Sequence, residues 1–358
     1  MKHCWIGVAR VALAIALGAA AGAASAQGAW RQGPPIPQGA NEVVGANVNG
    51  SLLVYGGQGT RNEPLGILWK FDPVAGQWTQ LKGNPVPVHH ATVAAVGSRL
   101  YLFGGFRLPG SDKPGWVDDG KPKIGWWPED KAWVYDLDKA SWTALPPMPT
   151  PRGALASVAV GTKIYVVGGA KVPAGADAPN GLVPGGPVEL LGTLEVFDTV
   201  TGTWKSLKPM SLPRNHHSVE VVDGKLYVMG GRVGSSYSGG WSSNVSMTEA
   251  YDIATDTWSA RAPMPTARSG TAIGVVDGRI HVLGGEGWIE EFGGVFRANE
   301  AYDPASNTWT KAARMPTPRH GFAAAVIGGR LYAVSGVNNA GGAGTLSVVN
   351  VNEIYELK

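Results

Sequence analysis

The sequence predicts an all-β protein, a six-bladed β-propeller, on the strength of two observations. Six tryptophans divide the chain into units of roughly 50 residues, and each precedes a glycine pair, or its counterpart in the sixth unit, at a constant distance. The units contain short apolar stretches bounded by turn residues, and no helical periodicity of useful length. Sheets repeated in this way can close radially, which protects their edges. The tryptophans are Trp30, Trp78, Trp142, Trp204, Trp258 and Trp309.

Two segments of each unit have constant length. The first glycine of the pair follows the tryptophan by 26 residues, and in the sixth unit Ser335 takes its place. Five of the tryptophans also follow, by six residues, an aspartate that comes directly after Phe or Tyr. All variation in length falls between the glycine pair and the next aspartate, which predicts a loop there. The first glycines are Gly56, Gly104, Gly168, Gly230 and Gly284, and the aspartates are Asp72, Asp136, Asp198, Asp252 and Asp303.

Each unit is predicted to contain four antiparallel strands. A Pro-rich turn, such as residues 146–152, follows the tryptophan strand and leads into a first strand of small apolar residues. A two-residue hairpin turn, such as Asn49-Gly50 or Asp223-Gly224, joins this strand to a second one that ends at the glycine pair. After the variable loop, a third strand ends at the aspartate and a fourth carries the next tryptophan. The small first strand suits the crowded position nearest the axis.

The pattern resembles the kelch-repeat family. Its marks are the paired glycines, a tyrosine three residues before the pair in four units, the Tyr-Asp step and the tryptophan, and they cover essentially all of residues 28–358. The resemblance implies a kelch-type six-bladed propeller. Trp30 has no Tyr-Asp step before it, and Tyr355 has no tryptophan after it. We therefore expect the N-terminal strand to complete the last blade. The four tyrosines are Tyr101, Tyr165, Tyr227 and Tyr332.

Residues 1–26 are predicted to be a signal peptide, which leaves a mature propeller domain over 27–358. Lys2 and Arg10 supply the positive start, an apolar run follows, and Ala24-Ser25-Ala26 is a small-residue cleavage site. We expect the protein to be exported, to the periplasm or the extracellular medium, with no membrane span in the mature chain.

Removal of this leader changes the chemistry available to the protein. The single cysteine, Cys4, leaves with it, so no disulfide or thiolate site remains. Lys2 and Arg10 also leave, so the 30 basic side chains become 28 against 27 acidic ones. This balance lacks the basic excess of a nucleic-acid-binding surface, and no nucleic-acid partner is expected.

Arginine and glutamate vary together among the units. Four units carry an arginine ten residues after the tryptophan, and the same four carry a glutamate three residues before the aspartate or its equivalent. The other two have Ala40 or Val88 for the arginine and Trp69 or Trp133 for the glutamate. This predicts structural ion pairs that are buried or half-buried, because loss of one partner would leave an unpaired charge, at a cost of about 3–5 kcal/mol if it is buried. A ring of guanidiniums that binds an anion is the alternative. The expected pairs are Arg152–Glu195, Arg214–Glu249, Arg268–Glu300 and Arg319–Glu353.

The variable loops are predicted to form the working face. In an up-and-down blade, the second-to-third connection and the connection to the next blade emerge on the same side, and loops on a rigid scaffold commonly bind ligands. Aromatic side chains in these loops suit stacking on sugars or anchoring of a partner, so we expect a binding module for a carbohydrate or a protein. Cores of the loops themselves are the alternative role. The tryptophans concerned are Trp116, Trp126, Trp127, Trp241 and Trp288.

Histidines gather just before the first strands of three alternating units. His90, His216 and His320 are expected at the mouth of the channel as ligand contacts. A three-sided metal site at the axis is conceivable. The histidines do not share one offset across the units, and a shift of one residue reverses the side of a strand on which a side chain lies. We therefore expect hydrogen bonding at the mouth and no metal.

A second hypothesis is an enzyme. The loop that contains Glu286 and Arg297 resembles that of periplasmic kelch-type sialic acid mutarotases, which implies Glu286 as a base on an anomeric hydroxyl and Arg297 as an anchor for a carboxylate. A solvated acidic loop is the alternative. Galactose oxidase, another kelch relative, uses a copper site with a cysteine-linked tyrosine, which a chain without cysteine cannot build. No nucleotide or phosphate motif occurs in a suitable context, so no cofactor is expected.

Overall fold

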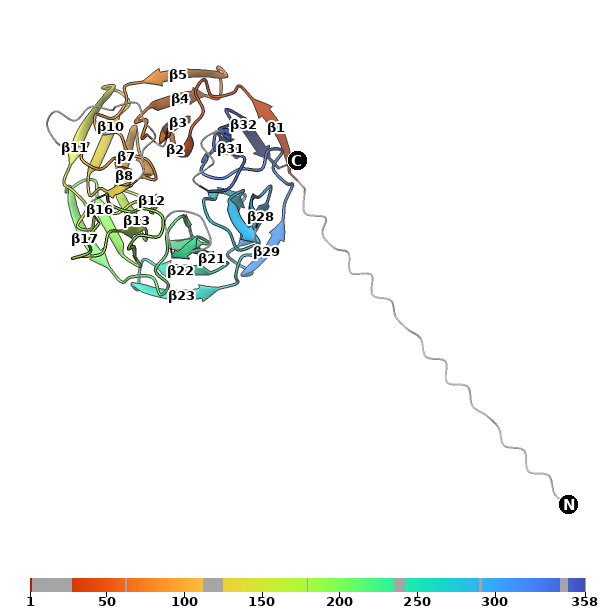
Figure 1. Ribbon diagram of the computed structural model, residues 1–358. Helices are drawn as coiled ribbons and strands as arrows, with labels where there is room; N and C mark the ends of the chain where they lie inside the picture. Colours follow the sequence, from red (N-terminus) through yellow and green to blue (C-terminus); the bar gives the residue numbers. More distant parts are fainter. Residues whose placement is uncertain are drawn as a thin grey trace.

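The computed structural model describes Met1 and residues 28–357, apart from 62, 112–124, 179, 235–241, 290–291 and 342–346. Six antiparallel sheets of four strands stand in a ring around a central axis, as Figure 1 shows. This confirms the predicted six-bladed propeller. Among the described residues there is no α-helix, and hence no helix of the length and apolarity needed to cross a bilayer.

Within each blade, the first strand lies nearest the axis and the following strands lie successively further out. Blades 1 and 2 consist of β2 (Asn41–Val48), β3 (Ser51–Gln58), β4 (Leu68–Asp72) and β5 (Gln77–Leu81), then β6 (Thr92–Val96), β7 (Arg99–Phe103), β10 (Ala132–Asp136) and β11 (Ser141–Leu145). Blades 3 and 4 consist of β12 (Ala156–Val160), β13 (Lys163–Val167), β16 (Leu194–Asp198) and β17 (Thr203–Leu207), then β18 (Ser218–Val222), β19 (Lys225–Met229), β22 (Thr248–Asp252) and β23 (Thr257–Arg261). Blade 5 consists of β24 (Ala272–Val276), β25 (Arg279–Leu283), β28 (Asn299–Asp303) and β29 (Thr308–Lys311).

The two ends of the chain share blade 6. It consists of β30 (Ala323–Ile327), β31 (Arg330–Val334), β32 (Asn352–Glu356) and, outermost, the N-terminal strand β1 (Ala29–Gly33). Trp30 lies opposite Tyr355 in the antiparallel register, with ring centroids 5.3 Å apart. The expected closure of the last blade by the first strand is confirmed.

Ser335, which replaces the first glycine in the sixth unit, strengthens this closure. Its backbone keeps a positive φ of 64°. Its hydroxyl accepts a hydrogen bond from the Ala40 amide at 2.8 Å and donates to the Ala40 carbonyl at 2.9 Å. Because Ala40 leads into blade 1, the one unit without the glycine gains a side-chain clasp where the ring closes.

The core lies between the blades. Apolar clusters fill each of the six blade interfaces; one example joins Leu53 and Tyr55 of blade 1 to Leu100 and Leu102 of blade 2. Each repeat tryptophan packs at such an interface and donates from Nε1 to a carbonyl of a neighbouring unit, as Trp142 does to Lys82 at 2.8 Å. The constant tryptophan spacing therefore reflects one repeated contact.

The four arginines and four glutamates that vary together pair inside the ring. Arg152 contacts Glu195 at 2.8 Å, Arg214 contacts Glu249 at 2.5 Å, Arg319 contacts Glu353 at 2.5 Å, and Arg268 contacts Glu300. All four arginine side chains are fully buried. Each arginine also donates to a carbonyl of the second strand, so the guanidinium ties the turn before the first strand to the middle of the blade.

Short hairpins extend the variable loops directly after four of the glycine pairs. Each pairs two to four residues, which carries the chain beyond the blade before it returns to the third strand. The hairpins are β8 (Phe106–Arg107) with β9 (Trp127–Pro128), β14 (Ala170–Lys171) with β15 (Glu189–Leu190), β20 (Arg232–Gly234) with β21 (Ser242–Asn244), and β26 (Glu286–Ile289) with β27 (Phe292–Val295).

Candidate functional site

One backbone position faces the axis in every blade. It is the residue twelve positions after the repeat tryptophan, and in all six units it has a positive φ between 52° and 62°. Backbone hydrogen bonds link it from blade to blade, for example from the amide of Ala154 to the carbonyl of His90 at 2.8 Å and from the amide of His216 to the carbonyl of Ala154 at 3.0 Å. We call these six residues the axial ring. Its members are Glu42, His90, Ala154, His216, Gly270 and Gly321.

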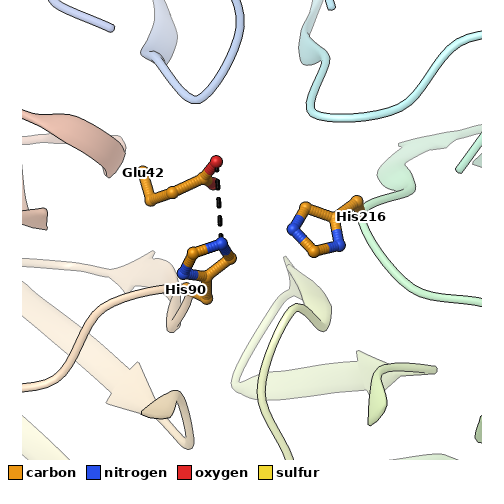
Figure 2. Close-up of side chains that lie close together, drawn as sticks. All are labelled: Glu42, His90 and His216. Atoms are coloured by element: carbon orange, nitrogen blue, oxygen red, sulfur yellow. Dashed lines mark ion pairs between the residues drawn. The ribbon is translucent and has the colours of Figure 1, made fainter. Parts of the chain in front are cut away.

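Three members of the axial ring carry ionisable side chains, and these side chains meet at the axis. Nε2 of His90 lies 3.6 Å from a carboxylate oxygen of Glu42, and the rings of His90 and His216 have centroids 5.0 Å apart. One ligand atom from each of Glu42, His90 and His216 lies within 4.8 Å of the other two. Figure 2 shows the three side chains close together. Left-handed backbone is unfavourable for residues with a Cβ and concentrates at functional sites.

The residue before each of these three orients it. The Asn41 side chain accepts from the amide of Glu42 at 2.9 Å. Nδ1 of His89 lies 2.5 Å from Nδ1 of His90, and the side-chain oxygen Oδ1 of Asn215 lies 2.5 Å from Nδ1 of His216. In both histidines the hydrogen bond at Nδ1 leaves Nε2 directed toward the axis.

A second pair of charged residues reaches the axis from the variable loops. Arg232 begins β20 and Glu286 begins β26, and each directly follows the glycine pair of its unit. Arg232 donates to the Glu286 carboxylate through Nη1, and its Nη2 donates to Nε2 of His216 at 3.0 Å. The amide of Gly341, from the last variable loop, donates to Glu286 at 2.7 Å.

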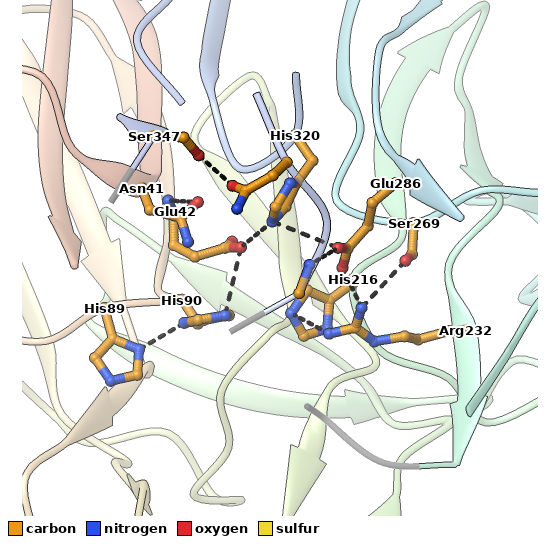
Figure 3. A network of polar contacts seen from close by, with 12 residues as sticks. Asn41, Glu42, His89, His90, His216, Arg232, Ser269, Glu286, His320 and Ser347 are labelled. Atoms are coloured by element: carbon orange, nitrogen blue, oxygen red, sulfur yellow. Dashed lines mark hydrogen bonds and ion pairs between the residues drawn. The ribbon is translucent and has the colours of Figure 1, made fainter. Parts of the chain in front are cut away.

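His320 lies between the two carboxylates. Its Nε2 is 3.6 Å from a carboxylate oxygen of Glu42 and 3.6 Å from one of Glu286, as Figure 3 shows. The side chain is buried, and its Nδ1 finds no hydrogen-bond partner among the described residues. His320 therefore connects the groups of the axial ring to those of the variable loops. We call the six residues together the axial cluster: Glu42, His90, His216, Arg232, Glu286 and His320.

The environment moves the two carboxyl pKa values in opposite directions. Burial raises the pKa of Glu42 above its usual value, and the opposing attraction of His320 is smaller. Burial also acts to raise the pKa of Glu286, but His320, Arg232 and the Gly341 amide together outweigh it and leave that pKa below its usual value. The pKa of Glu42 is thus raised and that of the neighbouring Glu286 is lowered, and carboxyl pairs whose pKa values are moved apart in this way are found at acid–base sites.

The histidines of the axial ring are held neutral. Burial lowers the pKa of His90 and of His216 well below the usual value, and the nearby positive charge of Arg232 acts in the same direction. Neutral imidazoles with a directed Nε2 can accept a hydrogen bond or bind a metal ion.

The axial cluster stands at the mouth of a channel. A cavity of about 160 Å³ lies inside the axial ring and is lined by Glu42, His90, His216 and residues of the six first strands. A second cavity of about 320 Å³ continues along the axis past Glu220. The mouth includes residues from both the inter-blade turns and the variable loops, which places both kinds of connection at the same end of the ring.

The residues predicted to contact a ligand at the mouth have different surroundings. His90, His216 and His320 come together with Glu286 in the axial cluster. Arg297 lies elsewhere: it is exposed, and its Nε donates to the carbonyl of Met315 at 2.6 Å. The arginine that contacts Glu286 is Arg232.

The tryptophans of the variable loops also differ. Trp126 is only 5% exposed, because it stacks on Phe106 and packs against the His90 ring with centroids 4.5 Å apart. It therefore belongs to a small core of the variable loops, which is the alternative role considered for these tryptophans. Trp127 is partly exposed and lies under the guanidinium of Arg107. Trp116 and Trp241 lie outside the described residues. Trp288 lies in β26, and its side chain is outside the described part as well.

Sequence reasoning missed Glu42 and Arg232, although the signal was present. Counted from the repeat tryptophans, Glu42 stands at the same offset as His90 and His216, and Arg232 at the same offset as Glu286. A comparison limited to histidines could not find this equivalence, because the third residue at the offset of His90 and His216 is a glutamate.

Comparisons with known proteins match most of the ring. The profile of the KLHDC2/KLHL20/DRC7 Kelch-repeats domain matches residues 27–211 and 130–336. Kelch-like protein terF of Aspergillus terreus is 31% identical over 302 residues, which are 82% of this chain and 60% of that protein. Human Kelch-like protein 34 is 28% identical over 260 residues, 72% of this chain and 36% of that protein. The chain thus spans between about a third and 60% of the length of these curated relatives.

Among solved structures, that of YjhT has a similar fold. The TM-score is 0.68 at 16% identity, and the match covers 90% of this chain and 96% of YjhT. At this identity the likeness concerns the fold alone.

Proposed function

Because this chain belongs to the kelch-repeat family of β-propellers, we propose that it is an exported binding protein whose ligand, a carbohydrate, occupies the mouth of the axial channel. The observation that carries this proposal is the axial cluster. Glu42, His90 and His216 line the cavity, and Arg232, Glu286 and His320 contact these residues or one another beside it. Two carboxyls, three imidazoles and a guanidinium form the mixture of donors and acceptors that suits neighbouring hydroxyl groups.

The size of the mouth favours a small ligand or one end of a larger one. Pockets for drug-sized molecules commonly measure about 300–1,000 Å³. The cavity inside the axial ring, at about 160 Å³, is smaller and admits a single sugar ring. The rest of the ligand would extend over the variable loops, where Trp127 is partly exposed beside Arg107 and can stack on a sugar face.

Kelch propellers are commonly protein-binding modules, so a polypeptide is the competing ligand. A protein partner would cover the variable-loop face broadly, and its affinity would depend little on groups inside the cavity. A sugar seated in the mouth would depend on them strongly. The two kinds of ligand are therefore separated by variants of buried residues.

The test is a glycan array probed with the mature chain, followed by calorimetric titration of the sugar that binds best. We expect Glu42→Gln and Arg232→Gln to weaken binding roughly 10–100-fold, since a hydrogen bond to a charged group contributes about 1.5–3 kcal/mol. Glu220→Gln is the matched control, because Glu220 lines the same channel away from the axial cluster. An array without binding, or equal affinities for wild type and Glu42→Gln, would overturn the proposal.

Export is the second part of the proposal and rests on the leader-like sequence of residues 1–26. Full-length protein expressed in a Gram-negative host should be recovered from the periplasm or medium with Gln27 at its N-terminus. Mass spectrometry of the purified protein measures this directly. Recovery of the uncleaved chain from the cytosol would contradict export and would leave the sugar-binding proposal untouched.

A mutarotase acting on an acidic sugar such as sialic acid is the second candidate function, favoured by the opposed pKa shifts of Glu42 and Glu286. The Glu286 carboxylate would take the proton of the anomeric hydroxyl while the protonated Glu42 gives its proton to the ring oxygen. The ring C–O bond breaks, the open chain rotates about the bond to the carbonyl carbon, and the reverse transfers close the other anomer. Arg232, which contacts Glu286, takes the place expected for Arg297.

Exchange between sialic acid anomers, followed by NMR, tests this candidate. An enzyme should accelerate the exchange, and Glu42→Gln should lower the rate roughly 10²–10⁴-fold, the usual contribution of a positioned proton donor. Unchanged exchange in the presence of the wild-type protein would remove the candidate.

A further inference from the structure

We propose that Glu42, His90 and His216 bind a divalent first-row transition-metal ion at the axis, with coordination positions left open toward the cavity. This goes beyond the proposed recognition of a sugar and does not depend on it. It also departs from the expectation of no metal. That expectation came from comparing only the histidines of the units, whose offsets from the repeat tryptophans differ. Glu42, His90 and His216 all lie twelve residues after a repeat tryptophan, so the three ligands are equivalent members of the axial ring.

The geometry suits convergence on one ion. The three candidate ligand atoms lie within 4.8 Å of one another. A zinc ion with ligands at about 2.0–2.2 Å would bring neighbouring ligand atoms to roughly 3.4 Å in a tetrahedral arrangement. Small rotations of the side chains can close this gap, because the three residues come from three different blades and all line the same cavity.

The tautomers needed for coordination are already supported. Asn215 accepts a hydrogen bond from Nδ1 of His216, and His89 can do the same for His90, which leaves both Nε2 atoms without hydrogen. Histidines that bind metal ions commonly use the other ring nitrogen in this way, and such partners contribute roughly 10–100-fold to affinity. Both supporting residues come immediately before the ligand in sequence, so one local arrangement serves two blades.

One contact must be exchanged when the metal binds. Arg232 donates to Nε2 of His216, the atom that would coordinate the ion. The same guanidinium already contacts the Glu286 carboxylate through its other terminal nitrogen, so it can keep a charged partner after it leaves His216. The pair Arg232–Glu286 then stands beside the metal as a neutral unit.

The ligand set indicates the class of metal. One carboxylate and two imidazoles suit zinc and iron(II), and sites of this composition keep positions for water or substrate. Calcium and magnesium, which prefer oxygen ligands, fit it poorly. The cavity of about 160 Å³ provides the space on the open side.

The experiment is calorimetric titration of the chelator-treated mature protein with Zn²⁺, with the stoichiometry checked by elemental analysis. We expect one ion per chain, and a loss of affinity in Glu42→Gln and in His216→Ala that exceeds 100-fold. Asn215→Ala should weaken binding by about 10–100-fold because it removes only an orienting partner. Glu220→Gln, which alters a carboxyl further along the channel, should bind as wild type does.

A second measurement needs no variant. Co²⁺ bound by imidazole and carboxylate in a low-symmetry site gives visible absorption bands that the hydrated ion lacks, and Zn²⁺ should displace it.

Two outcomes of these experiments would overturn the proposal. One is the absence of both stoichiometric Zn²⁺ uptake and a Co²⁺ spectrum, and the other is undiminished Zn²⁺ uptake by Glu42→Gln. Sugar binding by a protein that takes up no metal would overturn this inference alone, whereas metal uptake without sugar binding would overturn only the proposed function.

Discussion

Replacement of Glu249 by glutamine tests whether the buried ion pairs stabilise the ring. Glu249 accepts from Arg214 at 2.5 Å and from the amide of Ser211 at 3.0 Å. Glutamine keeps the shape of the side chain but removes its charge. The Arg214 guanidinium, which is fully buried, would then have carbonyl groups as its remaining partners.

The expected cost follows from this burial. Breaking a buried ion pair by removing one partner destabilises a protein by about 3–5 kcal/mol. With an unfolding entropy of about 2.1 cal/mol/K per residue, a folded ring of roughly 330 residues loses about 1.4 °C of melting temperature for each kcal/mol. Glu249→Gln should therefore melt roughly 4–7 °C below the wild type.

Differential scanning calorimetry of four proteins measures the effect. The double variant Arg214→Val with Glu249→Trp copies the residues that the second unit has naturally, Val88 and Trp133, and should recover most of the loss because no charge is left unpaired. The remaining two proteins are the wild type and Arg214→Val. A Glu249→Gln variant that melts within 1 °C of the wild type would refute the reasoning.

Three further predictions concern the channel and the closure of the ring. Burial raises the pKa of Glu220 to about 7 from the ordinary 4.5, so the folded state binds more protons; stability should fall as the pH rises from about 4.5 through 7, by at most about 3 kcal/mol. Urea unfolding measures the free energy of unfolding at pH 5 and at pH 8. The decrease between the two pH values should be smaller in Glu220→Gln than in the wild type, and an equal decrease in both proteins would contradict the prediction. Ser335→Gly restores the glycine of the other units but loses the clasp on Ala40, and should cost about 1–2 kcal/mol in the same assay; a more stable variant would exclude the clasp. Deletion of residues 28–33 removes β1 and its pairing with β32, and should abolish a single cooperative transition in calorimetry; an unchanged transition would show that closure does not stabilise the ring.

The fold was predictable from the sequence because its contacts repeat. Each repeat tryptophan makes the same hydrogen bond to a neighbouring unit, so its distance in sequence from the glycine pair, or its counterpart in the sixth unit, is the same in every unit. The arginine–glutamate pairing was visible for the same reason, since each blade offers an independent instance. Even the exception at Ser335 was visible, although its role required the structure.

The site was only partly predictable because its residues differ from blade to blade. Glu42 has no likeness to His90 or His216 except its offset, and only alignment by position brings the three together. The sequence left open whether Trp126 is exposed or part of a loop core. Its burial depends on a contact between two variable loops, in which Trp126 and Leu182 exchange backbone hydrogen bonds across neighbouring blades.

The axial ring has a consequence for how such a molecule can acquire a new specificity. Three of its six positions are occupied by Ala154, Gly270 and Gly321, which bring no polar side chain to the mouth. A longer side chain at position 154 would enter the same shared space on a left-handed backbone that the ring already tolerates in four units. A Cβ at Gly321 would instead collide with the Asn41 side chain, and one at Gly270 would press against His320. The chemistry of the mouth and the stability of the ring thus depend largely on separate sets of residues, and Ala154 is the position at which the chemistry could change with the least effect on its neighbours.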